Sequence, residues 1–340
     1  MIADGKQRAV AVWLVLCGAM VFAMVVLGGA TRLTDSGLSM VNWRLLIGIL
    51  PPISEAEWQE TFAKYRASPQ FRTMNFWMSV ADFKTIFWLE YIHRLWGRLI
   101  GLAFGLPLIW FAVRGYLDRP LMVRLFALLV LGGLQGLMGW YMVKSGLVDR
   151  PEVSQYRLAA HLALAFLILG YMQWLALGLL LPRASPPTAT CPCLRRLSVF
   201  ILAWVSLTVI AGAFVAGLDA GLAYNTFPLM DGQLVPDGAM TMSPWILNLF
   251  ENAALVQFNH RIASVISLLL VAGLWISGLR SGARGHARGA LHLMAVAVLV
   301  QFALGIATLL SCVVVWIAVA HQGGALVLFC AAIWVVYEFD

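Results

Sequence analysis

The stretch EYIHR at residues 90–94 is a polar sequence within a long apolar run. Ionisable side chains are costly inside a membrane, so such a stretch marks a functional site by default. Glu90 and His93 are three residues apart, which places them on one face of a helix. A second stretch, QFNHR at residues 257–261, repeats the pattern with glutamine in place of the glutamate. The chain therefore contains two related segments, each with one histidine.

The composition around these stretches indicates an integral membrane protein. Of 340 residues, 61% are hydrophobic and 11% are charged. A helix of about 20 apolar residues is long enough to cross the hydrocarbon core of a bilayer. Eight segments meet this criterion, at about 9–30, 86–113, 120–143, 156–181, 196–217, 252–279, 289–310 and 314–337. We therefore predict an all-α polytopic membrane protein with eight transmembrane helices, surrounded by membrane lipid.

The distribution of lysine and arginine predicts the orientation, because these residues are enriched in cytoplasmic loops. The opposite loop, 218–251, has neither residue and carries four acidic ones. Both termini are thus expected in the cytoplasm. The basic cytoplasmic segments also account for the formal net charge of +7, so we do not expect nucleic acid as a partner. The basic residues on the predicted cytoplasmic side are Lys6, Arg8, Arg114, Arg119, Arg124, Arg183, Arg195, Arg196, Arg280, Arg284 and Arg288.

The first outer loop, 31–85, contains a local helix signal. Ser54 followed by Glu57 is the pattern of a helix N-terminus, in which the two side chains cap backbone N–H groups. The helix is expected to run to about Arg66. It lies either on the membrane surface, as an amphipathic helix, or in the solvent as an ordinary loop helix.

The two halves of the chain repeat each other. Each half has four predicted helices, so both have the same orientation in the membrane. We predict two four-helix bundles related by a pseudo-twofold axis along the membrane normal. Four motifs recur in the same order: VxxGxxxxxxDxGL at 25–38 and 209–222, the histidine stretches at 90–94 and 257–261, QxxxG at 135–139 and 301–305, and AH at 160–161 and 320–321.

This repeat divides the chain into domains. The N-terminal bundle is expected at 1–181 and the C-terminal bundle at 196–340. The segment 182–195 between them is a cytoplasmic linker by its proline-rich composition. Its Cys191 and Cys193 form a C-P-C sequence, which resembles no common zinc pattern. They are expected to be free thiols.

Four of the six histidines occupy equivalent positions in the two halves. His93, His161, His260 and His321 fall on the second, fourth, sixth and eighth predicted helices, at similar depth below the outer surface. Two imidazoles from two helices of one bundle are a standard arrangement for axial ligation of a haem. Zinc would require three or four protein ligands. Two bis-histidine haem sites are therefore favoured, and the alternative is four structural histidines that bind neighbouring groups.

The two halves differ where Glu90 aligns with Gln257. A buried carboxylate beside a haem can move protons or stabilise positive charge, whereas a glutamine only forms hydrogen bonds. The first half is therefore predicted to be the reacting site and the second an accessory site, for example for electron transfer. Alternatively, Glu90 pairs with Arg94 or Arg98. Because arginine suits carboxylates, the candidates for binding haem propionates are Arg32, Arg94, Arg98 and Arg261.

Longer motifs resemble the haem A synthase family, and the resemblance covers nearly the whole chain. It implies conversion of haem O to haem A for assembly of cytochrome c oxidase. The methyl group at position 8 of the porphyrin would be oxidised to a formyl group by successive hydroxylations and loss of water. The motifs are GGATRLTDSGLS at 28–39, EYIHR at 90–94, AGLAYNTFPLM at 220–230 and NHR at 259–261.

The resemblance also implies roles for individual residues. The N-terminal half of this family binds the substrate haem O, which implies His93 and His161 as its axial ligands. The C-terminal half holds a haem B cofactor, which implies His260 and His321. The family's catalytic glutamate corresponds to Glu90. Implied partners are haem O synthase, oxidase assembly factors and an electron donor, and the helices rich in small residues would permit a homo-oligomer.

The outer loops depart from part of the family. Some members carry a cysteine pair in an outer loop of the first half, whereas loops 31–85 and 218–251 contain no cysteine. The chain therefore resembles the subgroup without this pair, which occurs in proteobacteria and mitochondria. The expected location is the inner membrane of a bacterium.

Two other functions fit parts of the pattern. A dihaem electron carrier of the cytochrome b type would also use bis-histidine sites. Such carriers commonly place two histidines on one helix, near opposite membrane sides, whereas this chain places one per helix at one depth. A transporter built from parallel repeats would not need the difference between Glu90 and Gln257.

Overall fold

The computed structural model describes residues 5–41, 50–148, 153–181 and 192–340. Eight of its helices are long and apolar enough to cross a membrane. The predicted all-α membrane protein with eight spanning helices is therefore confirmed. These helices are α1 (Gly5–Leu33), α4 (Val80–Val113), α5 (Arg119–Val148), α6 (Gln155–Leu180), α7 (Pro192–Gly217), α9 (Ala253–Arg280), α10 (Gly285–Leu310) and α11 (Val315–Phe339).

Side-chain caps determine where two of the helices begin. Helix α4 starts before the predicted residue 86 because Ser79 and Asp82 form a capping box. The Asp82 N–H donates to Ser79 Oγ at 3.3 Å, and the Ser79 N–H donates to Asp82 Oδ2 at 2.9 Å. Asn252 caps α9 by accepting from the N–H of Ala254 at 3.0 Å. Each cap provides an acceptor for a backbone donor that has no partner within the helix.

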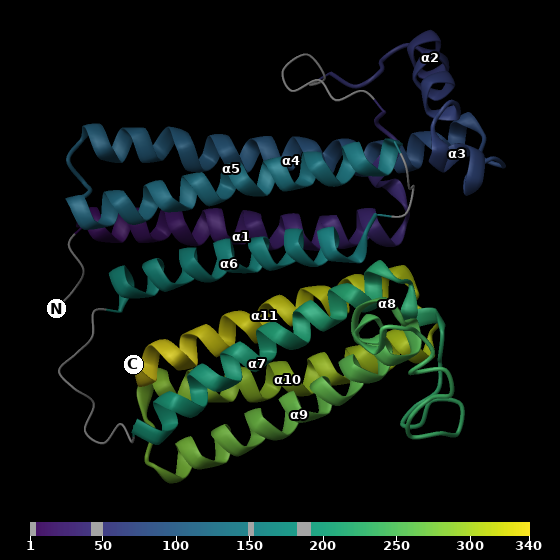
Figure 1. Cartoon of the computed structure of the whole chain (residues 1–340). Helices are drawn as coiled ribbons and strands as arrows, with labels where there is room; N and C mark the ends of the chain where they lie inside the picture. The colour runs from purple at the N-terminus through teal and green to yellow at the C-terminus, as the bar shows by residue number, and fades with distance from the viewer. Residues whose placement is uncertain (1–4, 42–49, 149–152, 182–191) are drawn as a thin grey trace.

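Four helices contact one another in a ring in each half of the chain. In the first half, α1 and α5 each contact both α4 and α6. In the second half, α7 and α10 each contact both α9 and α11. Figure 1 shows the two groups side by side, with the start of α1 and the end of α11 at one end of the helices and α2, α3 and α8 at the other.

The two groups meet through α1, α6, α7 and α11. Helix α1 contacts α11, α6 contacts α7, and α6 also contacts α11. Because the repeat pairs α1 with α7 and α6 with α11, a twofold rotation would exchange the first two contacts and preserve the third. The twofold axis itself, and the division into domains, remain predictions. Gln322 of α11 donates to the carbonyl of Val25 on α1 at 2.8 Å across this interface.

Each group of helices has its own apolar core. The first core includes Phe104 of α4 and Phe166 of α6, together with Phe329 of α11. The second includes Ile201 of α7 and Leu274 of α9, which are fully buried. Helix α11 contributes side chains to both cores, and this packing joins the two groups. In a membrane, close van der Waals packing of this kind drives the association of helices.

Short helices lie at the loop end. Helix α2 (Glu55–Arg66) has the predicted Ser54 capping box. Its Trp58, Phe62 and Tyr65 are buried in a cluster with Phe83 of α4. The apolar face of α2 is thus covered by protein, which agrees with the loop-helix alternative. The other short elements are η1 (Ser36–Leu38), α3 (Pro69–Thr73), η2 (Ala220–Leu222), η3 (Trp245–Leu247) and α8 (Asn248–Glu251).

The last residues of the predicted linker at 182–195 are helical. Helix α7 begins at Pro192, so the last residues of the predicted linker form its first turn. Cys193 lies in this turn as a free, exposed thiol. Residues 182–191, which include Cys191, lie outside the described part of the chain.

Candidate functional site

Each of the four candidate histidines lies against a glycine of a neighbouring helix. A Cβ atom built on Gly28 of α1 would lie 3.2 Å from Nε2 of His93 on α4. In the second half, a Cβ atom on Gly212 of α7 would lie 3.0 Å from Cε1 of His260 on α9. These two glycines occupy the same position of the repeated VxxG motif. Protein interiors are close-packed, so a larger residue at either position would displace the imidazole.

The QxxxG motif provides the second glycine of each pair. A Cβ atom on Gly139 of α5 would lie 3.3 Å from Cε1 of His161 on α6. A Cβ atom on Gly305 of α10 would lie 3.0 Å from Cε1 of His321 on α11. The sequence marked these glycines as part of a repeat but did not reveal that they face the histidines. In both rings, helices that carry a histidine alternate with helices that carry its glycine.

The separation of the second histidine pair is compatible with axial ligation of one iron. The ring centroids of His260 and His321 are 6.5 Å apart. A bond from a metal to an imidazole nitrogen is about 2 Å long, and the ring centre lies about 1 Å beyond that nitrogen. Two imidazoles on opposite sides of one iron therefore have their centroids about 6 Å apart. In the described part of the chain, the Nδ1 atoms of both rings lack a hydrogen-bond partner. The residues present therefore fit a bis-histidine haem.

A metal site of the zinc type finds less support. Among the described residues, the structure contains no group of three or more His, Cys, Asp or Glu side chains that could hold a metal ion. Zinc requires three or four protein ligands, whereas an iron in a porphyrin needs only the two axial ones. The arrangement of histidines in pairs is consistent with the second case.

His161 has an additional polar neighbour. Gln135 of α5 donates from Nε2 to the backbone carbonyl of His161 at 3.1 Å, and the same nitrogen lies 3.3 Å from Nε2 of the imidazole. Gln135 was not among the site residues predicted from the sequence. The only signal that could have identified it is its place at the start of the repeated QxxxG motif.

Glu90 is buried and holds the segment that follows η1. The relative exposure of Glu90 is 2%. Oε2 accepts from Ser39 Oγ at 2.6 Å and from the Met40 N–H at 2.8 Å. Oε1 accepts from the guanidinium of Arg94. The structure thus contains the Glu90–Arg94 pair that was the alternative to a catalytic role, and the carboxylate also fixes the loop.

The second half contains an equivalent clamp. Arg94 donates to the carbonyl of Met40 at 3.2 Å, and Arg261 donates to the carbonyl of Tyr224 at 2.8 Å. Met40 and Tyr224 are both five residues after the aspartate of the repeated motif. Gln257 donates from Nε2 to the same Tyr224 carbonyl at 3.1 Å. Each clamp therefore uses an i, i+4 pair on a helix to hold the backbone of the adjoining loop.

The polarity of the loops explains part of the difference between Glu90 and Gln257. The first loop presents two donors, the hydroxyl of Ser39 and the N–H of Met40. A carboxylate can accept hydrogen bonds from both. The second loop presents a carbonyl, to which an amide can donate. The loop contacts are thus a structural reason for the difference between Glu90 and Gln257, and they do not conflict with a chemical role of the carboxylate.

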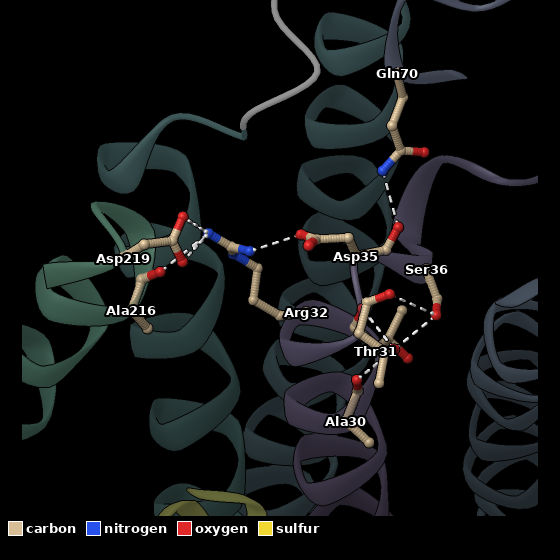
Figure 2. Close-up of polar contacts among 9 residues, drawn as sticks. Ala30, Thr31, Arg32, Asp35, Ser36, Gln70, Ala216 and Asp219 are labelled. Carbon is tan, nitrogen blue, oxygen red and sulfur yellow. Dashed lines mark hydrogen bonds and ion pairs between the residues drawn. The ribbon is translucent and has the colours of Figure 1, made fainter. Parts of the chain in front are cut away.

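A buried polar network supports the first clamp. Gln70 donates to the carbonyl of Asp35 at 2.8 Å, as Figure 2 shows. Tyr65 donates to Gln70 Oε1 at 3.1 Å and accepts from Asn75 at 2.7 Å. Burial raises the pKa of the Tyr65 phenol, so that it stays protonated and remains a donor. The network joins α2 and α3 to the turn at the end of α1.

Arg32 connects the two halves at the loop end (Figure 2). Its guanidinium lies 3.0 Å from Asp35 Oδ1 in its own half. It also donates to the carbonyl of Ala216 at 3.0 Å and lies 3.1 Å from Asp219 Oδ1 in the other half. Ala216 and Asp219 are the repeat equivalents of Arg32 and Asp35. Arg32 therefore contacts, in the second half, the residues that correspond to Arg32 and Asp35 of the first half.

The structure gives different surroundings to the four candidate arginines. Arg32 joins the halves, whereas Arg94 and Arg261 bind loop backbone. Within the described residues, Nη1 of Arg98 is buried without a hydrogen-bond partner. The Nε atoms of Arg32 and Arg261 are likewise buried without a partner among the described residues, so this property does not single out one arginine as the propionate ligand. A propionate contact of any of the four remains a prediction.

Comparison with known proteins agrees with this architecture. The family model of COX15-CtaA, described as a cytochrome oxidase assembly protein, matches residues 11–333. The chain is 51% identical to a heme A synthase of Nitrosospira multiformis over 98% of this chain and 94% of that protein. It is 45% identical to the heme A synthase COX15 of Mus musculus, over 98% and 82% of the two chains. The chain therefore belongs to the COX15-CtaA family of cytochrome oxidase assembly proteins.

Proposed function

We propose that the protein is a haem A synthase, a membrane oxidoreductase that converts haem O to haem A. The reaction would oxidise the methyl group at position 8 of the porphyrin to a formyl group. The observation that carries this proposal is the pair of histidines in each of two repeated helix rings, with a buried carboxylate one turn from a histidine in only one ring. The names of the relatives support it.

In this proposal the second half holds haem B as a cofactor between His260 and His321. When bound, the haem supplies an iron centre that takes up and releases one electron. The two imidazoles would orient it, and their separation of 6.5 Å supports this assignment. Gly212 and Gly305 keep the positions beside the rings free of side chains.

The first half binds haem O in this proposal, with His93 and His161 as its axial ligands. Glu90 precedes His93 by one helical turn, so its carboxylate lies near that ligand. We assign Glu90 a catalytic role: it accepts a proton, or it stabilises positive charge that develops at the methyl carbon. Arg94 and the loop at Ser39 hold the carboxylate in one orientation for this role.

A dihaem electron carrier is a less suitable function for this chain. Membership in the assembly-protein family does not favour it. A carrier that moves electrons across a membrane needs haems near both sides. His93, His161, His260 and His321 instead all lie in the first half of their helices, counted from the loop end.

The proposal includes a location and partners. The protein is an integral membrane protein by its eight apolar helices, and we place it in a bacterial inner membrane with both termini in the cytoplasm. Haem O would come from haem O synthase, and haem A would pass to oxidase assembly factors. The oxygen of the formyl group would come from dioxygen, in which case an electron donor is required in addition, or from water, in which case an electron acceptor is required. A homo-oligomer is compatible with the helix surfaces.

Extraction of the haems from the purified protein tests the proposed function. The extract is separated by chromatography, and each haem is identified by its mass. Haem B together with haem O, its hydroxylated form or haem A is the expected result. Haem B alone, from cells that make haem O, would refute the synthase and support an electron carrier.

A further inference from the structure

Gln135 and Gln301 occupy the same position of the repeated QxxxG motif but have different neighbours. The carboxamide of Gln135 lies on His161, with Nε2 3.1 Å from the backbone carbonyl and 3.3 Å from the imidazole Nε2. The carboxamide of Gln301 lies on the backbone of α11 at Gly324, where a Cβ atom would be 2.3 Å from its Oε1. The equivalent glutamines therefore take different positions relative to the histidine.

A single residue difference between the halves, at the position of Gly324, explains this difference between the glutamines. Gly324 lies three residues after His321, and the residue three after His161 is Leu164. A side chain at Gly324 would occupy the place of the Gln301 carboxamide. Leu164 has such a side chain, and it packs into the core of the first half. By the equivalence of the two positions, the Leu164 side chain would fill this place in the first half and leave Gln135 to turn toward the imidazole.

The contact has a consequence for His161 as a ligand. The carboxamide nitrogen of Gln135 carries only donors, so the imidazole Nε2 beside it is the accepting nitrogen. A nitrogen lone pair that accepts a hydrogen bond is not simultaneously available to a metal. His161 can therefore coordinate iron through Nε2 only after the Gln135 carboxamide withdraws, whereas, among the described residues, Gln301 interacts with the His321 imidazole through its backbone and not through a carboxamide donor.

We propose that Gln135 is a positioning residue that makes His161 the exchangeable axial ligand of the first half, while His321 is the permanent ligand of the second. This inference rests on the proposed function. A substrate haem must enter and its product must leave, whereas a cofactor haem remains bound. Two halves with the same histidine pair need a feature that makes one of them release its haem, and the Leu164–Gln135 arrangement provides it.

The rate of haem release tests this inference without measuring activity. The purified protein with its bound haems is mixed with excess apomyoglobin, and haem transfer is followed by absorption. The wild type is expected to release haem in a faster and a slower phase. Gln135→Leu should slow the faster phase by up to about tenfold, the factor that corresponds to one hydrogen bond. Gln301→Leu, the matched control, should leave both phases unchanged.

A second variant reaches the same state by another route. Leu164→Gly removes the side chain at the position that corresponds to Gly324. The Gln135 carboxamide can then lie against the backbone of α6, as Gln301 lies against the backbone of α11, and leave the imidazole. It should also slow the faster phase, and this result keeps the test decisive if Gln135→Leu does not fold. A wild type without a faster phase, or a faster phase unchanged in the folded variants, would overturn the inference.

A histidine variant separates this inference from the proposed function. His161→Ala should accelerate or abolish the faster phase. If it does so and Gln135→Leu has no effect, only the role of Gln135 is refuted. If His161→Ala leaves both phases unchanged, His161 is not the ligand of the exchanging haem, and the assignment of the first half to haem O falls together with the inference.

Discussion

The guanidinium of Arg32 lies 3.1 Å from the carboxylate of Asp219, and this ion pair joins the end of α1 to the turn after α7. The same guanidinium binds Asp35, the repeat equivalent of Asp219. One arginine thus connects equivalent aspartates of the two halves. The second half has Ala216 at the position of Arg32, so the connection is made once, from the first half only.

Replacement of Arg32 should weaken the association of the two halves. Arg32→Met removes the contacts to Asp35, Ala216 and Asp219, and we expect a loss of about 1–2 kcal/mol in the free energy of unfolding. Arg32→Lys should lose most of this as well, because an ammonium cannot bind both carboxylates in the planar geometry of a guanidinium. Thermal unfolding in detergent measures the effect.

A double-mutant cycle isolates the ion pair between the halves. Asp219 is largely exposed, so its coupling to Arg32 should be about 0.5–1 kcal/mol. The cycle combines Arg32→Met with Asp219→Asn. Additive effects of the two substitutions would show that the ion pair contributes nothing, and that the contacts to Asp35 and to the Ala216 carbonyl carry the stabilisation.

Glu90→Gln should stop the formation of haem A and leave the fold intact. The amide keeps the size of the side chain but cannot carry negative charge or accept a proton at neutral pH. We expect the haem A content of the purified protein to fall by about 100-fold or more, as for the loss of a proton-transfer group. Haem extraction and mass analysis measure this content, and circular dichroism checks the helix content.

The clamp at Glu90 requires a matched control. Gln257→Glu makes the reverse exchange in the second half, where the Tyr224 carbonyl would then face a carboxylate. It should weaken that loop contact and leave a catalytic group in the first half untouched. Normal haem A levels in Glu90→Gln would refute the catalytic role and leave the glutamate as the residue that holds the loop.

The glycines beside the histidines should not tolerate alanine. A Cβ atom at Gly212 would lie 3.0 Å from His260 Cε1, so Gly212→Ala should displace the ring and lower the haem B content. The steric cost is about 1–3 kcal/mol. Gly273→Ala on α9 is the control, because a Cβ atom there meets open space. Equal haem content in both variants would argue against a site beside Gly212.

The sequence predicted features that depend on local signals. Eight apolar runs of sufficient length became eight helices. The spacing of Ser54 and Glu57 predicted the start of α2, because a capping box involves only residues of one turn. The repeat likewise identified equivalent histidines from their spacing. Such signals need no knowledge of which helices lie together.

Contacts between distant residues could not be read from the sequence in the same way. Glu90 binds Met40, and Gln135 binds His161, only because particular helices are neighbours in the fold. Spacing along a helix gives the depth of a residue but not the helix that faces it. The sequence therefore suggested Arg94 as a partner of Glu90, four residues away, and did not identify the loop donors. Gln135 was visible only as part of a repeat.

His260 and His321 are the proposed haem ligands of the second half. In the proposed site the two rings, with centroids 6.5 Å apart, would be the two protein ligands of one haem, so His260→Ala and His321→Ala should each remove the low-spin haem B signal. Absorption spectra of the reduced protein and extracted haem B measure this loss. His292→Ala is the control: its Nδ1 atom accepts from Trp275 Nε1 at 3.0 Å, which gives His292 a structural role on α10. An unchanged haem spectrum in both ligand variants would refute the cofactor site, whereas loss of the signal in His292→Ala as well would indicate general destabilisation of the helix ring.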